Sequence, residues 1–314
     1  MSTVPRGRAR EQRATLGGIL SIIVWATSVP VSRIVLEQFG LHIGTGITLL
    51  GAGVFLVALT SWRARGLAWL RRVTLPHVMI CGPLFIGYLL LLYAAVGLAG
   101  SRDQAIVAGL ANYLWPGLIL VFSVVVLKAR VRWFGLIIGL ITCIAGVVLA
   151  SSGDVGSLAA LGRALAHSAR PLGLGIGAAI CWGLYSVLAS THHQAESSGT
   201  IGLFLMVTGV VALLLGAGRL GEIRANWEAI AAVAYMAFLP NSLAYWLWDE
   251  AMRGGAVQTL GALANAIPVL SAAIGTLILG LSFRMELLLG GGLVTLGAAI
   301  SRFSFRGKQG ASDT

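Results

Sequence analysis

The sequence predicts an all-α integral membrane protein whose ten transmembrane helices form two inverted repeats of five. Three observations support this fold class. Hydrophobic residues make up 57% of the 314 residues and charged residues only 11%, the mean hydropathy is +0.89, and an Asn–Pro pattern occurs twice in the chain. Because an average soluble domain carries about 25% charged residues, this composition predicts a chain that lies mostly in lipid.

The hydrophobic stretches are long enough to cross a bilayer. The hydrocarbon core is about 30 Å thick and an α-helix rises about 1.5 Å per residue, so a spanning helix needs roughly 20 mostly apolar residues. Ten stretches meet this requirement, five in each half of the chain. The predicted spans are residues 14–32, 41–61, 76–97, 104–127 and 131–151, followed by 171–191, 200–219, 228–251, 256–281 and 286–304.

The links between these spans are short, with one exception. Residues 152–170 are long enough to be a linker, so we expect a first five-helix repeat over 14–151 and a second over 171–305. Residues 1–13 and 306–314 would then be tails. The first span is longer than the apolar part of a signal peptide and many spans follow it, so we expect it to be retained as a helix.

The distribution of Lys and Arg predicts the orientation of the chain. With the N-terminus inside, the cytoplasmic links and tails hold 15 of the 22 basic residues and the opposite side holds 7. Cytoplasmic links are enriched in basic residues, so we expect both termini in the cytoplasm. The net charge of +11 is spread over links rather than gathered in a basic stripe with aromatic residues, so we do not expect a nucleic-acid partner.

Two segments repeat one pattern. Residues 110–117 read LANYLWPG and residues 263–270 read LANAIPVL, and in both the proline is followed 16 residues later by an arginine. Trp25 also aligns with Trp182 when the first and sixth spans are superposed. Five spans are an odd number, so the second copy must cross the membrane in the opposite direction. Inverted repeats place their substrate site near the bilayer midplane, although chance similarity between apolar segments remains the alternative.

Prolines and asparagines inside the spans indicate breaks in the helices. Pro116, Pro240 and Pro268 lie within spans, where a proline cannot donate to the carbonyl four residues earlier and kinks the helix. Asn112 and Asn265 precede two of these prolines by about one turn. Their amides either hydrogen-bond to neighbouring helices or line a cavity that the kinks open.

Several aromatic side chains lie deeper than the belt of Trp and Tyr that marks membrane interfaces. A deep indole or phenol needs a hydrogen-bond partner, which favours a cavity over contact with lipid. Tyr113 and Trp115 are about 200° apart around a helix, so they share one cavity only if the kink rotates the turn between them. The candidate substrate-binding residues are Trp25, Tyr88, Asn112, Tyr113, Trp115, Trp182, Tyr185, Asn241, Tyr245 and Asn265.

The sequence offers little for chemistry or energy coupling. Its acidic residues fall at span ends or in links. Because proton and sodium relays use carboxylates inside the membrane, facilitated transport is at least as well supported as coupled pumping. There is no phosphate-binding GxxxxGK[ST] motif, the three cysteines lack metal-ligand spacing, and His192 and His193 would diverge on a helix. We therefore expect no catalytic residue, no enzyme activity, no metal site and no cofactor.

Glycines recur at spacings that favour close helix packing. Gly135 and Gly139 form a GxxxG pattern, and further glycines crowd the last span. Small residues at this spacing let two helices approach closely. The pattern fits packing within the bundle or a contact between two copies of the chain.

The chain resembles the drug/metabolite transporter (DMT) superfamily of the EamA type over about residues 14–305. The resemblance rests on three features: the five-plus-five spans, the LAN pattern with proline in the fourth and ninth spans, and the tryptophans of the first and sixth spans. Within this superfamily, the deep aromatics of NYLWP and ICWGLYS are similar to those of YddG-type aromatic amino-acid exporters. The resemblance implies an exporter of aromatic and other neutral amino acids in the bacterial inner membrane, working by alternating access through a central aromatic-lined cavity.

Two other functions stay open on the sequence alone. One is a DMT-type exporter of another metabolite or drug, with or without proton coupling, and the other is a structural or signalling membrane protein. The expected partners are a small neutral amino acid or metabolite and the lipid bilayer. The sequence does not fix the oligomeric state, and a monomer is compatible with it.

The predicted orientation can be tested with reporter fusions. A fusion at Thr314 should report a cytoplasmic location, whereas a fusion near Ser157, in the link between the two repeats, should report the opposite side. The physical reason is the odd number of spans in each half, together with the excess of basic residues on one side. Both reporters on the same side would contradict the ten-span inverted arrangement.

Overall fold

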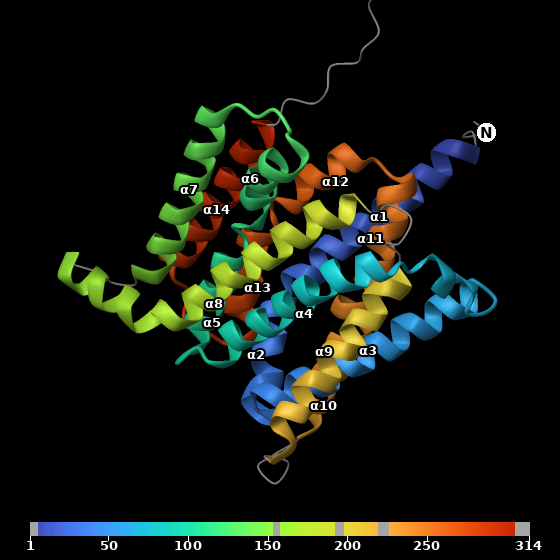
Figure 1. Ribbon diagram of the computed structural model, residues 1–314. Helices are drawn as coiled ribbons and strands as arrows, with labels where there is room; N and C mark the ends of the chain where they lie inside the picture. The colour runs from blue at the N-terminus through green and yellow to red at the C-terminus, as the bar shows by residue number, and fades with distance from the viewer. Residues whose placement is uncertain (1–5, 153–157, 192–197, 219–225, 305–314) are drawn as a thin grey trace, which may run out of the picture.

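The protein is a bundle of α-helices in a computed structural model that describes residues 6–152, 158–191, 198–218 and 226–304 (Figure 1). The tail 306–314 and the two adjacent histidines lie outside the described residues. The helices are α1 (Arg6–Ala26), α2 (Ser28–Phe39), α3 (Leu41–Arg63), η1 (Ala68–Arg72), α4 (Leu75–Gly97), α5 (Arg102–Asn112), α6 (Trp115–Leu127), α7 (Trp133–Ser152), α8 (Leu158–Ser190), α9 (Ser198–Gly216), α10 (Trp227–Phe238), η3 (Leu239–Leu243), α11 (Ala244–Gly254), α12 (Val257–Ala264), α13 (Ile267–Ile278) and α14 (Met285–Phe303).

Among the described residues, eight helical segments are long and apolar enough to cross a membrane. A ninth span is obtained if α1 and α2 are counted as one helix bent by 42°. The remaining predicted span, 256–281, is divided into α12 and α13, of 8 and 12 residues, so neither piece reaches spanning length. The all-helical, multi-span fold predicted from the sequence is confirmed. By length and composition, the described residues contain eight or nine spans, so the predicted number of ten is not confirmed.

The helix ends differ from the sequence prediction at three places. The first predicted span, 14–32, is broken at Thr27 and continues as α2 to Phe39. Helix α1 begins at Arg6, inside the segment expected to be a tail. Helix α8 begins at Leu158 and runs without interruption to Ser190, so most of the expected linker continues the sixth span as a helix. The added residues of α1 and α8 include several arginines, which lower the local hydropathy, so hydropathy alone did not place them in helices.

The prolines of the repeated pattern each begin a new helix. Pro116 and Pro268 are the second residues of α6 and α13, where a missing amide hydrogen is tolerated because no intrahelical partner exists. In the turns before them, the amides of Tyr113 and Asn265 donate to carbonyls three residues earlier, at 3.0 and 3.3 Å. The fourth and ninth predicted spans are therefore broken in the same way, by a tight turn followed by proline.

The eighth predicted span changes geometry at Pro240 through a π-helical turn, η3. A wide turn of this kind leaves backbone groups without their usual partners. The side chains of Asn241 and Ser242 donate to the carbonyls five residues before them, at 3.0 and 2.6 Å. These two polar residues satisfy the backbone of the turn within the protein.

Helices from the two halves of the chain pair with one another. The most extensive pairs are α3 with α9, α7 with α14, α4 with α8 and α1 with α11. In Figure 1, α7 and α14 lie side by side at the upper left, and α3 and α9 at the lower centre. Because each pair combines one helix from each half, the main contacts of either half are made with the other.

Glycines bring α7 and α14 into close contact. A Cβ atom built on Gly146 would lie 2.5 Å from the carbonyl oxygen of Gly290, and one on Gly290 would lie 2.6 Å from that of Gly146. Gly139 and Gly297 stand in the same reciprocal relation. The glycine-rich face of α7, which the sequence could also assign to a second copy, is thus occupied by α14 of the same chain.

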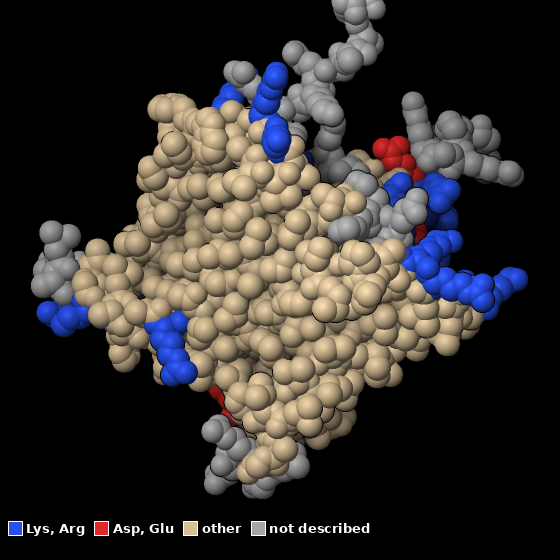
Figure 2. Space-filling model, in the orientation of Figure 1, with Lys and Arg blue, Asp and Glu red and all other residues tan. Residues whose placement is uncertain are grey.

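The surface is apolar between charged edges. Figure 2 shows a broad uncharged area with Lys, Arg, Asp and Glu gathered around its margins. Large side chains such as Phe134 and Leu277 are 80% and 81% exposed. Soluble monomers rarely expose contiguous apolar patches of more than a few hundred Å², so this surface is suited to lipid.

The close contact between α7 and α14 gives a matched pair of substitutions on one helix. Gly290→Ala places a methyl group against the backbone of α7, whereas Gly292→Ala meets nothing within 4 Å. We expect Gly290→Ala to cost about 1–3 kcal/mol and to lower the thermal unfolding midpoint in detergent by several degrees. Gly292→Ala should leave it unchanged or raise it slightly, because alanine favours helix by about 1 kcal/mol over glycine. Equal effects would contradict the reciprocal packing.

Candidate functional site

Aromatic side chains from four helices meet in the largest apolar core among the described residues. Phe85 of α4 lies at their centre and is fully buried. Its ring centroid is 5.1 to 6.3 Å from those of Tyr88, Trp182, Tyr185 and Tyr245. We call these five residues, together with Trp25, the aromatic cluster. Residues of α1, α4, α8 and α11 that are far apart in the chain thus contact one another.

Two Tyr–Trp pairs within the cluster are related by a constant offset in sequence. The Tyr88 and Trp182 centroids are 4.8 Å apart, and those of Tyr245 and Trp25 are 5.3 Å apart. Tyr245 follows Tyr88 by 157 residues, and Trp182 follows Trp25 by the same number. Each pair combines a tyrosine from one half with a tryptophan from the other, and Phe85 contacts a member of both.

Phe85 is the member of the cluster that sequence reasoning missed. A phenylalanine in an apolar helix carries no polar signal that would separate it from lipid-facing residues. The offset of 157 residues, which also relates Pro83 to Pro240, would have aligned the third span with the eighth. That alignment pairs Tyr88 with Tyr245, and Phe85 lies one helical turn before Tyr88.

The indole of Trp25 is fixed by the bend in the eighth predicted span. Its Nε1–H donates to the carbonyl oxygen of Pro240 at 3.0 Å, and its ring lies 5.3 Å from that of Trp248. A deep indole needs such a partner, and here the partner is a backbone carbonyl at the π-helical turn. The orientation of Trp25 therefore depends on the geometry of the bend.

Two asparagines place polar groups beside the aromatic rings. Asn241 is buried, and its amide donates to the hydroxyl of Tyr93 at 3.1 Å. Asn112 is 6% exposed and contacts the hydroxyl of Tyr88. The Oδ1 atom of Asn112 accepts no hydrogen bond from the described residues. A buried acceptor without a partner costs about 1–3 kcal/mol, so this atom still has the capacity to accept a hydrogen bond.

The helix break separates Tyr113 from Trp115. Tyr113 lies in the turn after α5, and its side chain contacts Ser271 of α13. Trp115 begins α6, and its ring meets that of Trp182 edge-on at 6.5 Å. Trp115 therefore reaches the aromatic cluster, while Tyr113 packs toward the ninth predicted span.

Asn265 is not equivalent to Asn112. It lies three residues before Pro268, as Tyr113 lies three residues before Pro116, and it caps the end of α12. Its side chain makes no hydrogen bond within the described part of the chain, and it is partly exposed. The repeated letters of the two LAN segments are thus offset by one residue in the structure.

Charged side chains tie four helices together where α2 ends. Glu37 accepts hydrogen bonds from Arg33 and Arg102, each at 2.7 Å. Arg33 also donates to the carbonyl of Val96 at the end of α4, and Arg102 donates to that of Leu279 after α13, at 2.9 and 2.8 Å. This Glu37 network joins α2, α4 and α5 of the first half to α13 of the second.

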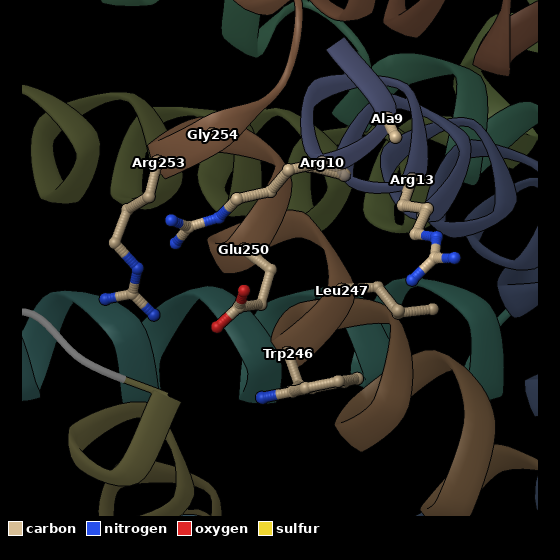
Figure 3. Close-up of a pocket in the computed structure, with 10 residues that line it drawn as sticks. Ala9, Arg10, Arg13, Trp246, Leu247, Glu250, Arg253 and Gly254 are labelled. Atoms are coloured by element: carbon tan, nitrogen blue, oxygen red, sulfur yellow. The ribbon is translucent and has the colours of Figure 1, made fainter. Parts of the chain in front are cut away.

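The pocket drawn in Figure 3 lies away from the aromatic cluster, between the beginning of α1 and the end of α11. The sequence predicts a cavity among the central aromatics. In the structure the rings of the cluster contact one another closely, and this pocket opens toward the charged margin instead.

Comparison with known proteins identifies the family. Residues 12–152 and 170–303 match the model of the EamA-like transporter family. The chain belongs to this family. The resemblance inferred from the repeated pattern is confirmed, and the EamA-like chain is a multi-pass membrane transport protein rather than an enzyme.

Curated relatives align with most of the EamA-like chain, and each is named "Aromatic amino acid exporter YddG". The protein of Salmonella typhimurium is 27% identical over 92% of this chain and 96% of its own. That of Ancylobacter novellus is 29% identical over 83% and 87%, and that of Escherichia coli 25% over 85% and 89%. A solved crystal structure shares the fold, with a TM-score of 0.68, 24% identity and coverage of 92% and 97%.

Proposed function

We propose that the protein exports aromatic and other neutral amino acids across the bacterial inner membrane, with the aromatic cluster as the substrate site. The observation that carries this proposal is the meeting of two Tyr–Trp pairs from opposite halves around Phe85. Aromatic rings stack on one another with about 0.5–1.5 kcal/mol beyond the burial of their surface. The names of the relatives point to the same class of substrate.

The break in the fourth predicted span suits the two charges of an amino acid. Helix α5 ends at Asn112, whose Oδ1 has no partner among the described residues. Helix α6 starts at Trp115, next to Trp182. A helix carries partial negative charge at its C-terminus and partial positive charge at its N-terminus. The end of α5 and Asn112 would therefore receive the ammonium group, and the start of α6 the carboxylate.

The proposal includes ten spans in two inverted repeats of five, with both termini in the cytoplasm. Its support is the pairing of helices between the halves, the equivalent breaks before Pro116 and Pro268 and the offset shared by the Tyr–Trp pairs. In this orientation the Glu37 network lies at the outer end and the pocket at the cytoplasmic end. Alternating access would require the network to open for release of the substrate.

An exporter of another metabolite or drug is the alternative within the same family. A metabolite or drug with flat apolar rings would also stack on the aromatic cluster, so the cluster alone does not distinguish such a solute from an aromatic amino acid. The unpartnered Oδ1 of Asn112 favours a solute that carries a hydrogen-bond donor. A comparison of solutes with and without an aromatic ring tests the proposal directly.

Removal of a cluster ring should affect aromatic substrates most. We expect Trp182→Ala to weaken phenylalanine transport several-fold and threonine transport less, because the lost stacking surface serves only the aromatic solute. Trp115→Ala should act in the same direction but more weakly, since its ring touches only the edge of the cluster. The measurement is the KM for both solutes in proteoliposomes.

The matched control is Trp227→Ala, because Trp227 is 78% exposed at the beginning of α10. It should leave both KM values unchanged. Equal losses for phenylalanine and threonine in Trp182→Ala would assign the ring to packing of the bundle, and undiminished transport of both would remove it from the site.

Transport should not require a proton gradient. The side chains of the aromatic cluster are uncharged, and Glu37 is held at the end of the bundle by two arginines. We therefore expect counterflow of labelled phenylalanine to continue in proteoliposomes after an uncoupler has collapsed the gradient. Vesicles without protein measure leakage. Complete loss of protein-dependent flux in intact vesicles would show that the solute gradient is not the driving force.

A further inference from the structure

A pocket of about 540 Å³ lies between the first turns of α1 and the last turns of α11 (Figure 3). Arg10 and Arg13 of α1 line it, as do Trp246, Leu247 and Glu250 of α11. The pocket thus combines positive charge, negative charge, an aromatic ring and an apolar side chain. Small-molecule sites typically have volumes of roughly 300–1,000 Å³, so an amino acid fits within it.

Three charged groups of this pocket have no ionic partner among the described residues. Within the described residues, the side chains of Arg10, Arg13 and Glu250 form no ion pair or hydrogen bond, whereas Arg253 is paired with Asp249. In Figure 3, Arg10, Arg253 and Glu250 surround one side of the pocket, and Arg13 projects beside Leu247. A ligand with one anionic and one cationic group would complement both signs of charge.

The pocket continues a seam between α1 and α11 that leads to the aromatic cluster. Nearest the pocket, a Cβ atom on Gly17 would lie 3.3 Å from Leu247. One turn further, the hydroxyl of Ser21 donates to the carbonyl of Ala244 at 2.9 Å. One turn beyond that lies Trp25. The eight residues from Gly17 to Trp25 cover roughly 12 Å of helix, so the pocket and the cluster are about two turns apart.

We propose that this pocket is a loading site that binds the zwitterionic head group of an amino acid before it enters the aromatic cluster. The inference rests on the proposed function and on the cytoplasmic location of the N-terminus. Arg10 and Arg13 hold the carboxylate and Glu250 holds the ammonium group. The part of the Trp246 ring that lines the pocket contacts the side chain, while the guanidinium of Arg63 lies over that ring at 4.6 Å. The cluster has no charged side chain, so the ionic contacts are made here, where water still solvates the charges.

Glu250 distinguishes this ligand from the head group of an anionic lipid. Arginines at the cytoplasmic face attract anionic lipids in many membrane proteins, and Arg10 and Arg13 would suit a phosphate. An anionic head group, however, would place its charge beside the carboxylate of Glu250, which has no ion-pair partner among the described residues. The presence of both charges in one pocket favours a zwitterion.

The test uses two analogues of phenylalanine that each lack one charge. 3-Phenylpropionate keeps the carboxylate and phenethylamine keeps the ammonium group, and both are measured as inhibitors of phenylalanine uptake into inside-out membrane vesicles. The double variant Arg10→Gln/Arg13→Gln should weaken inhibition by 3-phenylpropionate about two- to fivefold, as expected for exposed ion pairs, and spare phenethylamine. Glu250→Gln should do the reverse, and both variants should raise the KM for phenylalanine.

The control variant is Arg71→Gln/Arg72→Gln, which removes two arginines of η1 that do not line the pocket. It should behave as the wild type with both analogues. Variants of the pocket that change neither analogue, or change both equally, would overturn the loading site while leaving the proposed export in place. If the effect of Arg10→Gln/Arg13→Gln appears only in vesicles containing phosphatidylglycerol, the pocket binds lipid, and this result would also overturn the loading site. A wild type that moves no phenylalanine would overturn the proposed function, and this inference with it.

Discussion

Lipid offers no hydrogen-bond partner to the backbone, so each break in a spanning helix has to be satisfied by the protein itself. The structure does this in two ways. Tight turns close the backbone before Pro116 and Pro268, and side chains complete the π-helical turn at Pro240, where Asn241 and Ser242 donate inward. The indole of Trp25 uses the carbonyl of Pro240. The same hydrogen bonds that permit the breaks therefore orient residues of the aromatic cluster.

The pairing of helices between the halves explains why the cluster forms where it does. Close backbone contact at Gly146 and Gly290 holds α7 against α14, and α4 and α1 pack against α8 and α11. Each Tyr–Trp pair spans two helices from different halves. A movement of one half relative to the other would change these contacts, which couples the site to any rearrangement of the bundle.

Among the described residues, charge gathers at the margins of the molecule, and its arrangement differs between the two ends. Ionised side chains are costly inside a membrane, which agrees with an aromatic cluster of uncharged residues. At one end, Glu37 is shared by two arginines and the network joins both halves. At the other, Arg10, Arg13 and Glu250 surround an open pocket. One end is thus held together by ion pairs, while the other presents charges to solvent.

Local properties of the sequence determined the helical, multi-span class and the breaks near Pro116, Pro240 and Pro268, because hydropathy and the missing amide hydrogen of proline act within a few residues. They also indicated that the tryptophans of the first and sixth spans occupy equivalent positions in the two halves of the chain. The bend of 42° between α1 and α2 was not predicted. Only the tertiary structure decided which side chains meet: Phe85 lies at the centre of the cluster, Trp115 reaches it, and Asn265 caps a helix instead. Contacts between membrane helices depend on how each helix is rotated about its axis. That rotation is set by the small residues and polar groups of the partner helix, which lie more than a hundred residues away in this chain.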